Sequence, residues 1–440
     1  MRKTPFTAML AATLLGGCGA ALANTGYSQD KPIARDNAPN EVYGVSGQEK
    51  PGAFYANLRI YDDAAATHES LKSVIGGYAT NETSAFDNLV TMSGGKVTEL
   101  LVGGYATTGG QARDNSVVMT GGEMTGQIAG GYVNGNGNAD SNTVVVGGDS
   151  HATQVYGGLT RNGFANGNTV TLSGGNITRD LVGGYSLNGN VGGNSVIVTG
   201  GSVENVCGAF FTEAQSITGN KVLISGGQVG TARAYYIHHA SKVEYADNVI
   251  IMSGGKTNSL LNAERIHLAG AGFNGSIEGV ENIAGQALNC GSVGSCDSID
   301  IYGSLITATS LSARVALNFH LMNGLLTEDT PMVTLGDTLS LSKDLTLSFD
   351  ALDSMEWKPG DSVTLVNAKE SMGIAPELLA REYNIYRYGD PAKTIVATAK
   401  LELDQDNTVL MLTVQGIPEP ATGTLGLLAL AGLAARRRRM

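Results

Sequence analysis

The sequence predicts an all-β protein: a stacked β-solenoid with about 26–27 residues per coil, followed by a smaller β-rich C-terminal region. Three observations indicate this class. A segment that begins with Asn and ends with Gly-Gly recurs along the chain. A second series, Gly-Gly-Tyr, alternates with the first. The chain of 440 residues contains 61 glycines, and only 15% of its residues are charged. This composition fits neither a disordered chain nor a helical bundle.

The first series has the pattern of a half-buried strand. In the copy that starts at Asn168, the third and fifth residues are Val170 and Leu172, and these positions are apolar in every copy. Alternate residues point to the same face of a strand, so this face is expected inside. We expect the leading asparagines to form a side-chain amide ladder with a structural role. They are Asn88, Asn115, Asn142, Asn168, Asn194, Asn220 and Asn248, at steps of 27, 27, 26, 26, 26 and 28 residues.

Glycine pairs follow both strand-like units of each coil. Gly94-Gly95 ends one unit, and Gly103-Gly104 precedes Tyr105 in the other. Because glycine permits positive φ angles, we expect both pairs to form tight corners. The second series decays at Cys207, which takes a position held elsewhere by Val or Ala and is expected to be buried. The repeats place the solenoid at residues 53–280.

The first 23 residues are typical of a secretory signal peptide. Arg2 and Lys3 precede an apolar run, and Ala21 and Ala23 form a small-residue site for signal peptidase. A lipoprotein signal is an open alternative, with Cys18 as the lipidated residue. Both interpretations predict export. Residues 24–52 are polar and predict a leader or an irregular cap.

Residues 281–415 are expected to form a β-rich region that caps the solenoid. Apolar and polar residues alternate between turn signals, as in 345–349, and a helix is possible near 376–382. Such a region would cover the last open strand edge. Cys290 and Cys296 lie close in the sequence of an exported chain, so we expect a local disulfide, with two reduced thiols as the alternative.

The C-terminal segment 416–440 has three parts in order: a Pro-Glu-Pro motif, an apolar run over 421–435 and an arginine cluster. Their key residues are Pro418, Glu419, Pro420, Arg436, Arg437, Arg438 and Arg439. This segment resembles a PEP-CTERM sorting signal. The apolar run is short for a full membrane span of about 20 residues, and the arginines are expected on the cytoplasmic side. A plain C-terminal membrane anchor is the alternative.

The resemblance implies a route for the exported chain. The tail would hold the precursor in the inner membrane of a Gram-negative bacterium until an exosortase-type enzyme cuts near Pro-Glu-Pro. The product would then reach the cell surface or the extracellular matrix, in an organism that makes exopolysaccharide. The repeats also resemble the passenger segments of autotransporter adhesins. The part after them is too short for a membrane β-barrel, which needs at least about eight strands of ten residues.

Candidate sites are few. No nucleophile motif, phosphate loop or metal-ligand spacing is present, so we expect no catalytic residue, metal or cofactor. Asp87 and Asp114 precede ladder asparagines and would lie about 5 Å apart in stacked coils. Two such carboxylates can bind calcium or act in glycan cleavage. We favour a solvated corner, because Gly167 and Gly193 hold the same place in other coils.

Two further sets of polar residues are candidates for a metal site and for an ice-binding surface. His238 and His239 are adjacent and fit an exposed edge or loop better than a metal site. A hydroxyl array on the outer face could order water, as in ice-binding proteins, although Ile197, Lys221 and other residues interrupt its columns. The array consists of Thr91, Ser93, Thr120, Thr169, Thr171, Ser173 and Thr199.

The formal net charge is −12, and six of the 28 basic residues lie in the two terminal segments. So acidic a body argues against nucleic-acid binding, which needs basic patches. The sequence therefore predicts an exported, non-enzymatic surface or matrix protein, adhesin-like and associated with exopolysaccharide. A solenoid polysaccharide lyase or glycoside hydrolase is the alternative, and an ice-binding protein is a second one.

Overall fold

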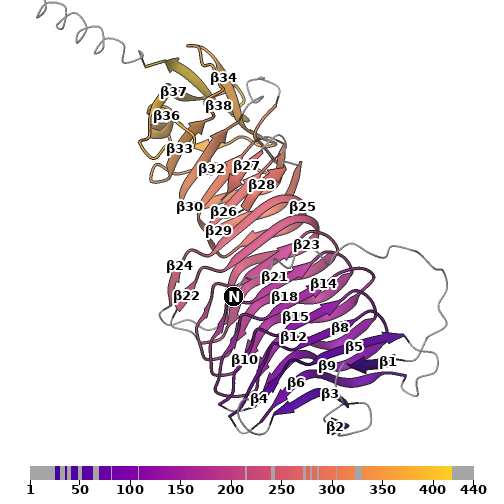
Figure 1. The fold of residues 1–440 in the computed structure, drawn as a ribbon. Helices are drawn as coiled ribbons and strands as arrows, with labels where there is room; N and C mark the ends of the chain where they lie inside the picture. Colours follow the sequence, from indigo (N-terminus) through magenta and orange to yellow (C-terminus); the bar gives the residue numbers. More distant parts are fainter. Residues whose placement is uncertain are drawn as a thin grey trace, which may run out of the picture.

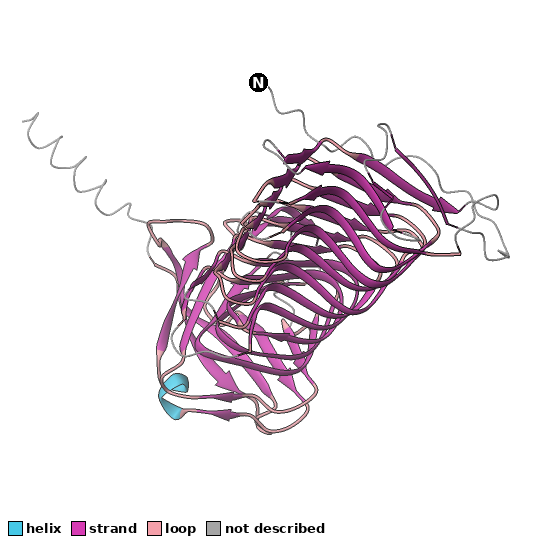
Figure 2. Ribbon diagram, turned by 90° about the horizontal axis from the view of Figure 1, so that it is seen from below, coloured by secondary structure: helices cyan, strands magenta, loops and turns pink. Residues whose placement is uncertain are grey.

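The computed structural model describes residues 25–29, 35–36, 41–47, 52–62, 69–80, 82–107, 109–213, 216–238, 243–270, 274–277, 280–284, 287–303, 305–322 and 330–418. The predicted fold class is confirmed. Figure 1 shows an elongated stack of coils that climbs from the indigo N-terminal strands to a yellow C-terminal region. Figure 2 shows the strands of successive coils lying on one another, and a single short helix, α1 (Pro376–Leu379), far along the stack.

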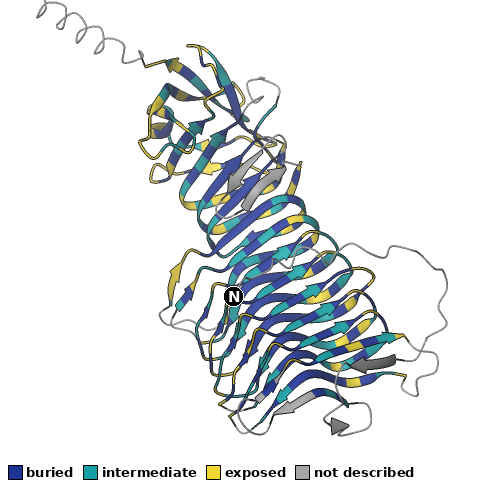
Figure 3. Cartoon of the chain, in the orientation of Figure 1, coloured by how far each residue is buried: buried dark blue, intermediate teal, exposed yellow. Residues whose placement is uncertain are grey.

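One row of strands is formed by the Asn-led segments. Neighbours pair in parallel without a shift, so Val170 lies beside Val144 on one side and Val196 on the other. The third and fifth residues of each segment are buried, as predicted, and Figure 3 shows buried positions alternating with more open ones. The row consists of β5 (Asn57–Asp62), β8 (Leu89–Met92), β11 (Ser116–Met119), β14 (Thr143–Val146), β17 (Thr169–Leu172), β20 (Ser195–Val198), and the first parts of β23 (Lys221–Ile237) and β25 (Val249–Leu261).

A second row carries the Gly-Gly-Tyr series. It consists of β3 (Glu41–Gly47), β6 (Leu71–Ala79), β9 (Lys96–Ala106), β12 (Glu123–Val133), β15 (His151–Thr160), β18 (Asn176–Ser186), β21 (Ser202–Phe211) and the second part of β23. Two short rows close the coils. They are β4 (Gly52–Phe54), β7 (Ser84–Phe86), β10 (Ala112–Arg113) and β13 (Ala139–Asp140), then β16 (Ala165–Asn166), β19 (Val191–Gly192), β22 (Ser216–Thr218) and β24 (Glu244–Ala246).

The expected amide ladder is present and buried. The side-chain Nδ2 of each ladder Asn donates to Oδ1 of the next, at 2.8–3.1 Å from Asn88 to Asn248. The same Oδ1 also accepts a backbone N–H, as where Asn142 N donates to Asn168 Oδ1 at 2.9 Å. The second Nδ2 hydrogen of Asn168 reaches the Ala139 carbonyl at 2.9 Å. Each buried amide therefore has partners for both its oxygen and its nitrogen, which buried polar groups require.

The two glycine pairs differ in kind, which corrects the prediction that both form corners. Gly95 has φ 78°, and its counterparts in the other coils also have positive φ, so this pair makes a corner. Gly103 and Gly104 instead lie inside β9 and have no positive φ. A Cβ on Gly104 would overlap the side chain of Asn115. The second pair is therefore glycine because the amide ladder occupies the space.

The parallel stack is longer than 53–280. It begins at β3, inside the segment predicted as a polar leader, where Val42 pairs with Val74 and is buried. It continues beyond residue 280 in β29 (Leu288–Tyr302), which pairs in parallel with β30 (Ile306–Leu321). The intervening strands are β26 (Ala263–Ala269), with β27 (Asn274–Ile277) and β28 (Val280–Ala284) as a hairpin.

The C-terminal region then closes the stack with antiparallel strands. β36 (Glu382–Arg387), β37 (Ile395–Leu403) and β38 (Val409–Gly416) form a meander, and β38 also pairs with β34 (Ser362–Ala368). Before the meander, parallel stacking reaches β36 through β33 (Thr346–Ala351). The remaining described strands are β1 (Thr25–Gln29), β2 (Arg35–Asp36), β31 (Val333–Leu335), β32 (Ser340–Leu341) and β35 (Gly373–Ile374).

The predicted disulfide is wrong. Cys290 and Cys296 are both free and buried, and both lie in the continuous strand β29. β29 turns between them, where Ser295 has a φ of 53° and the strand register shifts, so the two side chains belong to different rows of the stack. Cys290 Sγ lies 3.5 Å from Met252 Sδ, whereas Cys296 pairs in register with Ala263 and Ala313. Cys207 is buried, as expected.

Candidate functional site

A column of aromatic rings runs up the outer face of the second strand row. It is formed by the residue after each Gly-Gly pair, and the rings of Tyr78 and Tyr105 lie 5.4 Å apart. Tyr105 and Tyr132 follow at 5.0 Å. Further along the stack, Phe210 lies 4.9 Å from both Tyr185 and Tyr236. The parallel register places one residue of this column in every coil, so the spacing of the rings follows the spacing of the strands.

The rings cover a second apolar layer that is separate from the main core. Its buried members include Ile75, Val102, Ala129, Val182 and Cys207, one from each of several coils. Each of these residues follows a core residue in its strand, as Val102 follows Leu101. Successive side chains of a strand point to opposite faces, so these residues point away from the core. The aromatic side chains therefore lie half-buried on this layer, with one side of the column open to solvent.

The column is hollowed over the coils of β15, β18, β21 and β23. In β15 the order of side chains changes: Tyr156 takes the Val position, and Leu159 takes the Tyr position. A groove of about 480 Å³ lies here. It is lined by Gln154, Tyr156, Arg179, Asp180, Val182, Tyr185, Asn205, Cys207, Phe210, Arg233, Tyr236 and His238. His238 is exposed at its edge, while His239 lies outside the described residues.

Polar side chains form the rim of this groove. Asp180 accepts hydrogen bonds from Gln154 Nε2 at 2.9 Å and from Asn205 Nδ2 at 3.3 Å. Arg179 Nη2 lies 3.9 Å from Asp180 Oδ2. The guanidinium of Arg233 lies over the ring of Tyr236, 5.5 Å from its centroid. The groove thus combines ring surfaces with amides and charged groups that can bind a polar ligand.

Burial keeps the Cys207 thiol and the Tyr156 and Tyr185 hydroxyls of the groove neutral. Burial raises the pKa of the Cys207 thiol to about 12, against the smaller opposing influence of Arg233. It also raises the pKa of the Tyr185 hydroxyl, and that of Tyr156 still further, where the charge of Asp180 adds to the effect. A catalytic base or nucleophile needs a pKa near the working pH. These groups are therefore suited to hydrogen bonding and packing.

The acidic column has a backbone explanation. Asp87, Asp114 and Asp247 have φ of 56–58°, and Gly167 and Gly193 have φ of 65° and 63° at the same place in their coils. This position therefore requires a left-handed conformation, which Asp and Gly adopt more readily than most residues. Burial, and then the charge of Asp114, raises the pKa of Asp87. Within the part of the chain that the structure describes, no group of three or more His, Cys, Asp or Glu could hold a metal ion.

The hydroxyl array is interrupted, as the sequence indicates. Thr91 and Thr171 belong to one column of the first strand row, but Val118 and Val145 lie between them. Ile197 and Leu223 continue the column beyond Thr171. Only two of these six positions carry a hydroxyl group, so this column is broken. In the neighbouring column, Ser116, Thr143, Thr169 and Ser195 are four successive hydroxyl residues, and Lys221 follows them.

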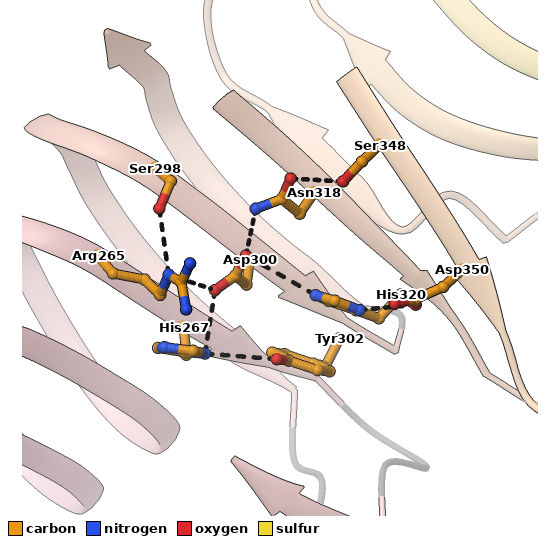
Figure 4. A network of polar contacts seen from close by, with 9 residues as sticks. All are labelled: Arg265, His267, Ser298, Asp300, Tyr302, Asn318, His320, Ser348 and Asp350. Atoms are coloured by element: carbon orange, nitrogen blue, oxygen red, sulfur yellow. Dashed lines mark hydrogen bonds and ion pairs between the residues drawn. The ribbon is translucent and has the colours of Figure 1, made fainter. Parts of the chain in front are cut away.

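A second polar cluster joins four strands beyond the regular repeats (Figure 4). Asp300 on β29 lies 3.2 Å from His267 Nδ1 on β26, measured from its Oδ2. On β30, His320 Nδ1 lies 2.7 Å from Asp350 Oδ1 on β33, and its Nε2 lies 3.8 Å from Asp300 Oδ1. The ring of Tyr302 stacks on that of His320 at 4.0 Å. The cluster therefore ties the last coils of the stack together by charge and ring contact.

The charges in this cluster stabilise one another. Burial alone would lower the pKa of His320, but its contacts with the carboxylates of Asp300 and Asp350 outweigh burial and raise it. Burial alone would raise the pKa of Asp300, but His320 and His267 outweigh that effect and lower it. Both shifts favour the charged forms, the imidazolium of His320 and the carboxylate of Asp300.

No protein-family model, curated protein or solved structure matches this chain. The site must therefore be interpreted from its own geometry.

The predicted processing sites lie mostly outside the described residues. These are Ala21 and Ala23, the lipidation candidate Cys18, and everything from Glu419 onward. Pro418, the first residue of the sorting motif, is described, and it is exposed two residues after the end of β38. Within 25–418, none of the described helices is long and apolar enough to cross a membrane, and the apolar run 421–435 falls beyond them.

The sequence predicts strands that carry the Gly-Gly-Tyr motif, but it assigns no role to the tyrosine. The signal was present, because an aromatic residue recurs after the glycines at the same period as the ladder asparagines. The cluster of His267, Asp300 and His320 left no comparable signal. His267 and Asp300 share one column of the stack, His320 lies in another, and the three come from strands of unequal length.

Proposed function

We propose that this chain is an exported, non-enzymatic surface or matrix protein that associates with polysaccharide through its aromatic column. The observation that carries the proposal is one aromatic ring per coil along most of the second strand row, at 4.9–5.4 Å. Export and sorting rest on the signal peptide and on the likeness of the tail to PEP-CTERM signals. An exosortase-type enzyme would release the precursor from the inner membrane to the cell surface or matrix.

The chemistry of the column suits a glycan. A sugar ring has apolar C–H surfaces that pack against aromatic side chains, and hydroxyl groups that need hydrogen-bond partners. The column supplies the first, and Gln154, Asn205 and the tyrosine hydroxyls supply the second. The step from ring to ring is comparable to the length of one sugar unit in an extended chain. A polysaccharide that lies along the stack can therefore contact several coils.

The stack supplies rigidity to this surface. The buried amide ladder fixes each coil to the next, so the rings are held in place before any ligand arrives. A ligand that binds a fixed surface does not have to order it, and the cost of binding is lower. Rigid elongated shape and repeated contacts also fit an adhesin-like or matrix role.

The test is retention of the exported protein on the exopolysaccharide of the producing cell. Wild-type protein, Tyr185→Ala and the matched control Tyr386→Ala would be compared by co-sedimentation. Tyr386 lies on β36 of the C-terminal region, far along the chain from the column. We expect Tyr185→Ala to lose most retention and Tyr386→Ala to keep it. Equal retention of all three would contradict the role of the column, and release of sugar products would contradict the non-enzymatic role.

A further inference from the structure

We infer that the groove over β15, β18, β21 and β23 selects an acidic polysaccharide and binds a sugar carboxylate beside Arg233. This inference rests on the proposed function and adds the class of ligand. It is carried by two independent features of the groove: the way its rings are stacked, and the position of one guanidinium group.

Three rings of the groove, those of Tyr185, Phe210 and Tyr236, present their edges to the ligand, whereas Tyr156 meets Tyr185 at 75° and belongs to the ring surface that packs against sugar C–H groups. Tyr185 and Phe210 are stacked with an interplanar angle of 16°, and Phe210 and Tyr236 with an angle of 28°. Rings stacked at 4.9 Å cover one another's faces, so their edges form the open surface. An aromatic ring is electron-rich on its faces and positive at its edge. A row of edges therefore favours oxygen atoms and, most of all, carboxylate oxygens.

Arg233 adds a full positive charge to this surface. In the register of the strands it lies between Cys207 and Leu261, so a guanidinium interrupts an otherwise apolar column. The guanidinium of Arg233 lies over the ring of Tyr236, and it forms no ion pair with a carboxylate of the described residues. Arg179, by contrast, lies 3.9 Å from Asp180. The charge of Arg233 is therefore the one that a ligand can neutralise.

The overall charge of −12 does not oppose this. Charges on exposed parts of the protein are screened beyond roughly 8–10 Å at physiological ionic strength. A carboxylate within hydrogen-bond distance of Arg233 is screened much less, and the planar guanidinium can donate two parallel N–H bonds to it. Local recognition can therefore operate on an acidic protein.

The test compares two polymers that differ only in charge. Polygalacturonate carries one carboxylate per sugar, and its fully methyl-esterified form carries none. Affinity of the exported protein for each would be measured by affinity electrophoresis at low and high salt. We expect at least about ten-fold tighter binding of the acidic polymer, in line with a charged hydrogen bond, and a smaller ratio at high salt.

Variants then locate the contact. Arg233→Gln should reduce binding of the acidic polymer about ten-fold and leave binding of the ester unchanged. Arg233→Lys should retain part of the preference, and Arg381→Gln, an exposed arginine of the C-terminal region, should change neither. Thermal unfolding of each variant shows whether the fold is intact. If Arg233→Gln does not fold, the affinities of wild-type protein and Arg233→Lys for the two polymers still test the carboxylate site, because Arg233→Lys should show a weaker preference for the acidic polymer.

The outcomes separate this inference from the proposed function. Equal binding of both polymers would leave polysaccharide association standing and overturn the preference for acidic chains. Preference for the acidic polymer that Arg233→Gln does not reduce would overturn the assignment of the carboxylate site. Binding of neither polymer, together with no retention on the native exopolysaccharide, would overturn both proposals.

Discussion

The side chain of Asn142 donates from Nδ2 to Oδ1 of Asn168 at 3.0 Å, and the backbone N–H of Asn142 donates to the same oxygen at 2.9 Å. One amide oxygen thus accepts two bonds from the coil before it. Because both residues are fully buried, water cannot replace a lost partner. The spacing of about 26 residues in the sequence becomes a single continuous hydrogen-bonded chain in the fold.

The first prediction concerns this ladder. Asn168→Asp keeps the size of the side chain, but it removes the Nδ2 donor to Asn194 and buries a negative charge. We expect a loss of roughly 3 kcal/mol or more in the free energy of unfolding. Asn162→Asp is the matched control, because Asn162 makes the same kind of inter-coil bond, to Asn136 at 2.9 Å, on the exposed surface. Urea unfolding measures both, and equal losses would contradict the structural role of the buried ladder.

The second prediction concerns the glycines that make room for the ladder. An added methyl on Gly104 would overlap the side chain of Asn115. We expect Gly104→Ala to destabilise the protein by roughly 2–3 kcal/mol, as overpacking in a core does. Gly294→Ala is the control, since the nearest atom to its new methyl would be Ser312 O at 3.7 Å, an ordinary contact. Thermal unfolding of the pair would show no difference if Gly104 were only a flexible corner.

These two predictions show where sequence reasoning succeeded and where it failed. Strand facing was predictable because a two-residue alternation repeats in stacked coils, as at Val170 and Leu172. The role of Gly104 could not be predicted. The same Gly-Gly sequence provides a positive φ at Gly95, but at Gly104 glycine is required because a larger side chain would overlap Asn115. The cause lies in a side chain one strand later in the coil, which composition alone does not reveal.

The candidate sites show the same division. The position before each ladder Asn is a corner, as predicted, since the Asp, Ser or Gly residue there has a positive φ, as at Asp87, Ser141 and Gly167. The short separation of Cys290 and Cys296 predicts a disulfide, but both thiols are free and lie in one 15-residue strand that turns between them.

The third prediction concerns these thiols. Burial raises the pKa of both Cys290 and Cys296 to about 12, so neither forms a reactive thiolate at neutral pH. We expect the native protein to resist alkylation by iodoacetamide at pH 7.5 at Cys207, Cys290 and Cys296. All three should react after unfolding in guanidinium without reductant. Mass spectrometry counts the labels, and failure of Cys290 and Cys296 to react in the unfolded protein would restore the disulfide.

The fourth prediction concerns the cluster around His320. The pKa of His320 is raised in the folded state, because its contacts with the carboxylates of Asp300 and Asp350 outweigh burial. Its contribution to stability is therefore complete below the unfolded pKa of about 6.5, and it is lost as pH rises through the higher folded value. Asp300, with a lowered pKa, contributes above an unfolded value of about 3.9, and that part is lost as pH falls through its folded value.

His320→Gln should abolish the loss of folding stability that wild-type protein shows as the pH rises through the folded pKa of His320. We expect the variant to be less stable by roughly 2 kcal/mol near pH 5.5, since it removes the imidazolium from the buried Asp300 and the partly buried Asp350, although Arg265 and His267 remain beside Asp300. The difference from wild type should shrink as the pH rises toward 9. His151→Gln, at an exposed position of β15, is the control and should follow the wild-type curve. Parallel curves for wild type and His320→Gln in urea unfolding from pH 5 to 9 would refute the ion pair.

The last prediction concerns sorting. β38 ends at Gly416, and Ile417 and Pro418 are exposed, so the chain leaves the folded body immediately before the Pro-Glu-Pro motif. An enzyme in the membrane could reach this motif without unfolding the cap. If the tail acts as its PEP-CTERM likeness implies, the mature protein loses roughly twenty C-terminal residues and leaves the inner membrane.

Two variants separate the parts of this signal. Replacing Pro418, Glu419 and Pro420 with alanine should block cutting, so that full-length protein accumulates in the membrane fraction. Replacing Arg436 to Arg439 with glutamine should weaken the orientation of the tail, because basic residues hold a segment on the cytoplasmic side. The measurement is the mass of the C-terminal peptide in surface-displayed protein. A peptide that still ends at Met440 would show that the tail is a permanent anchor, because a cut near the motif removes that residue from every mature molecule.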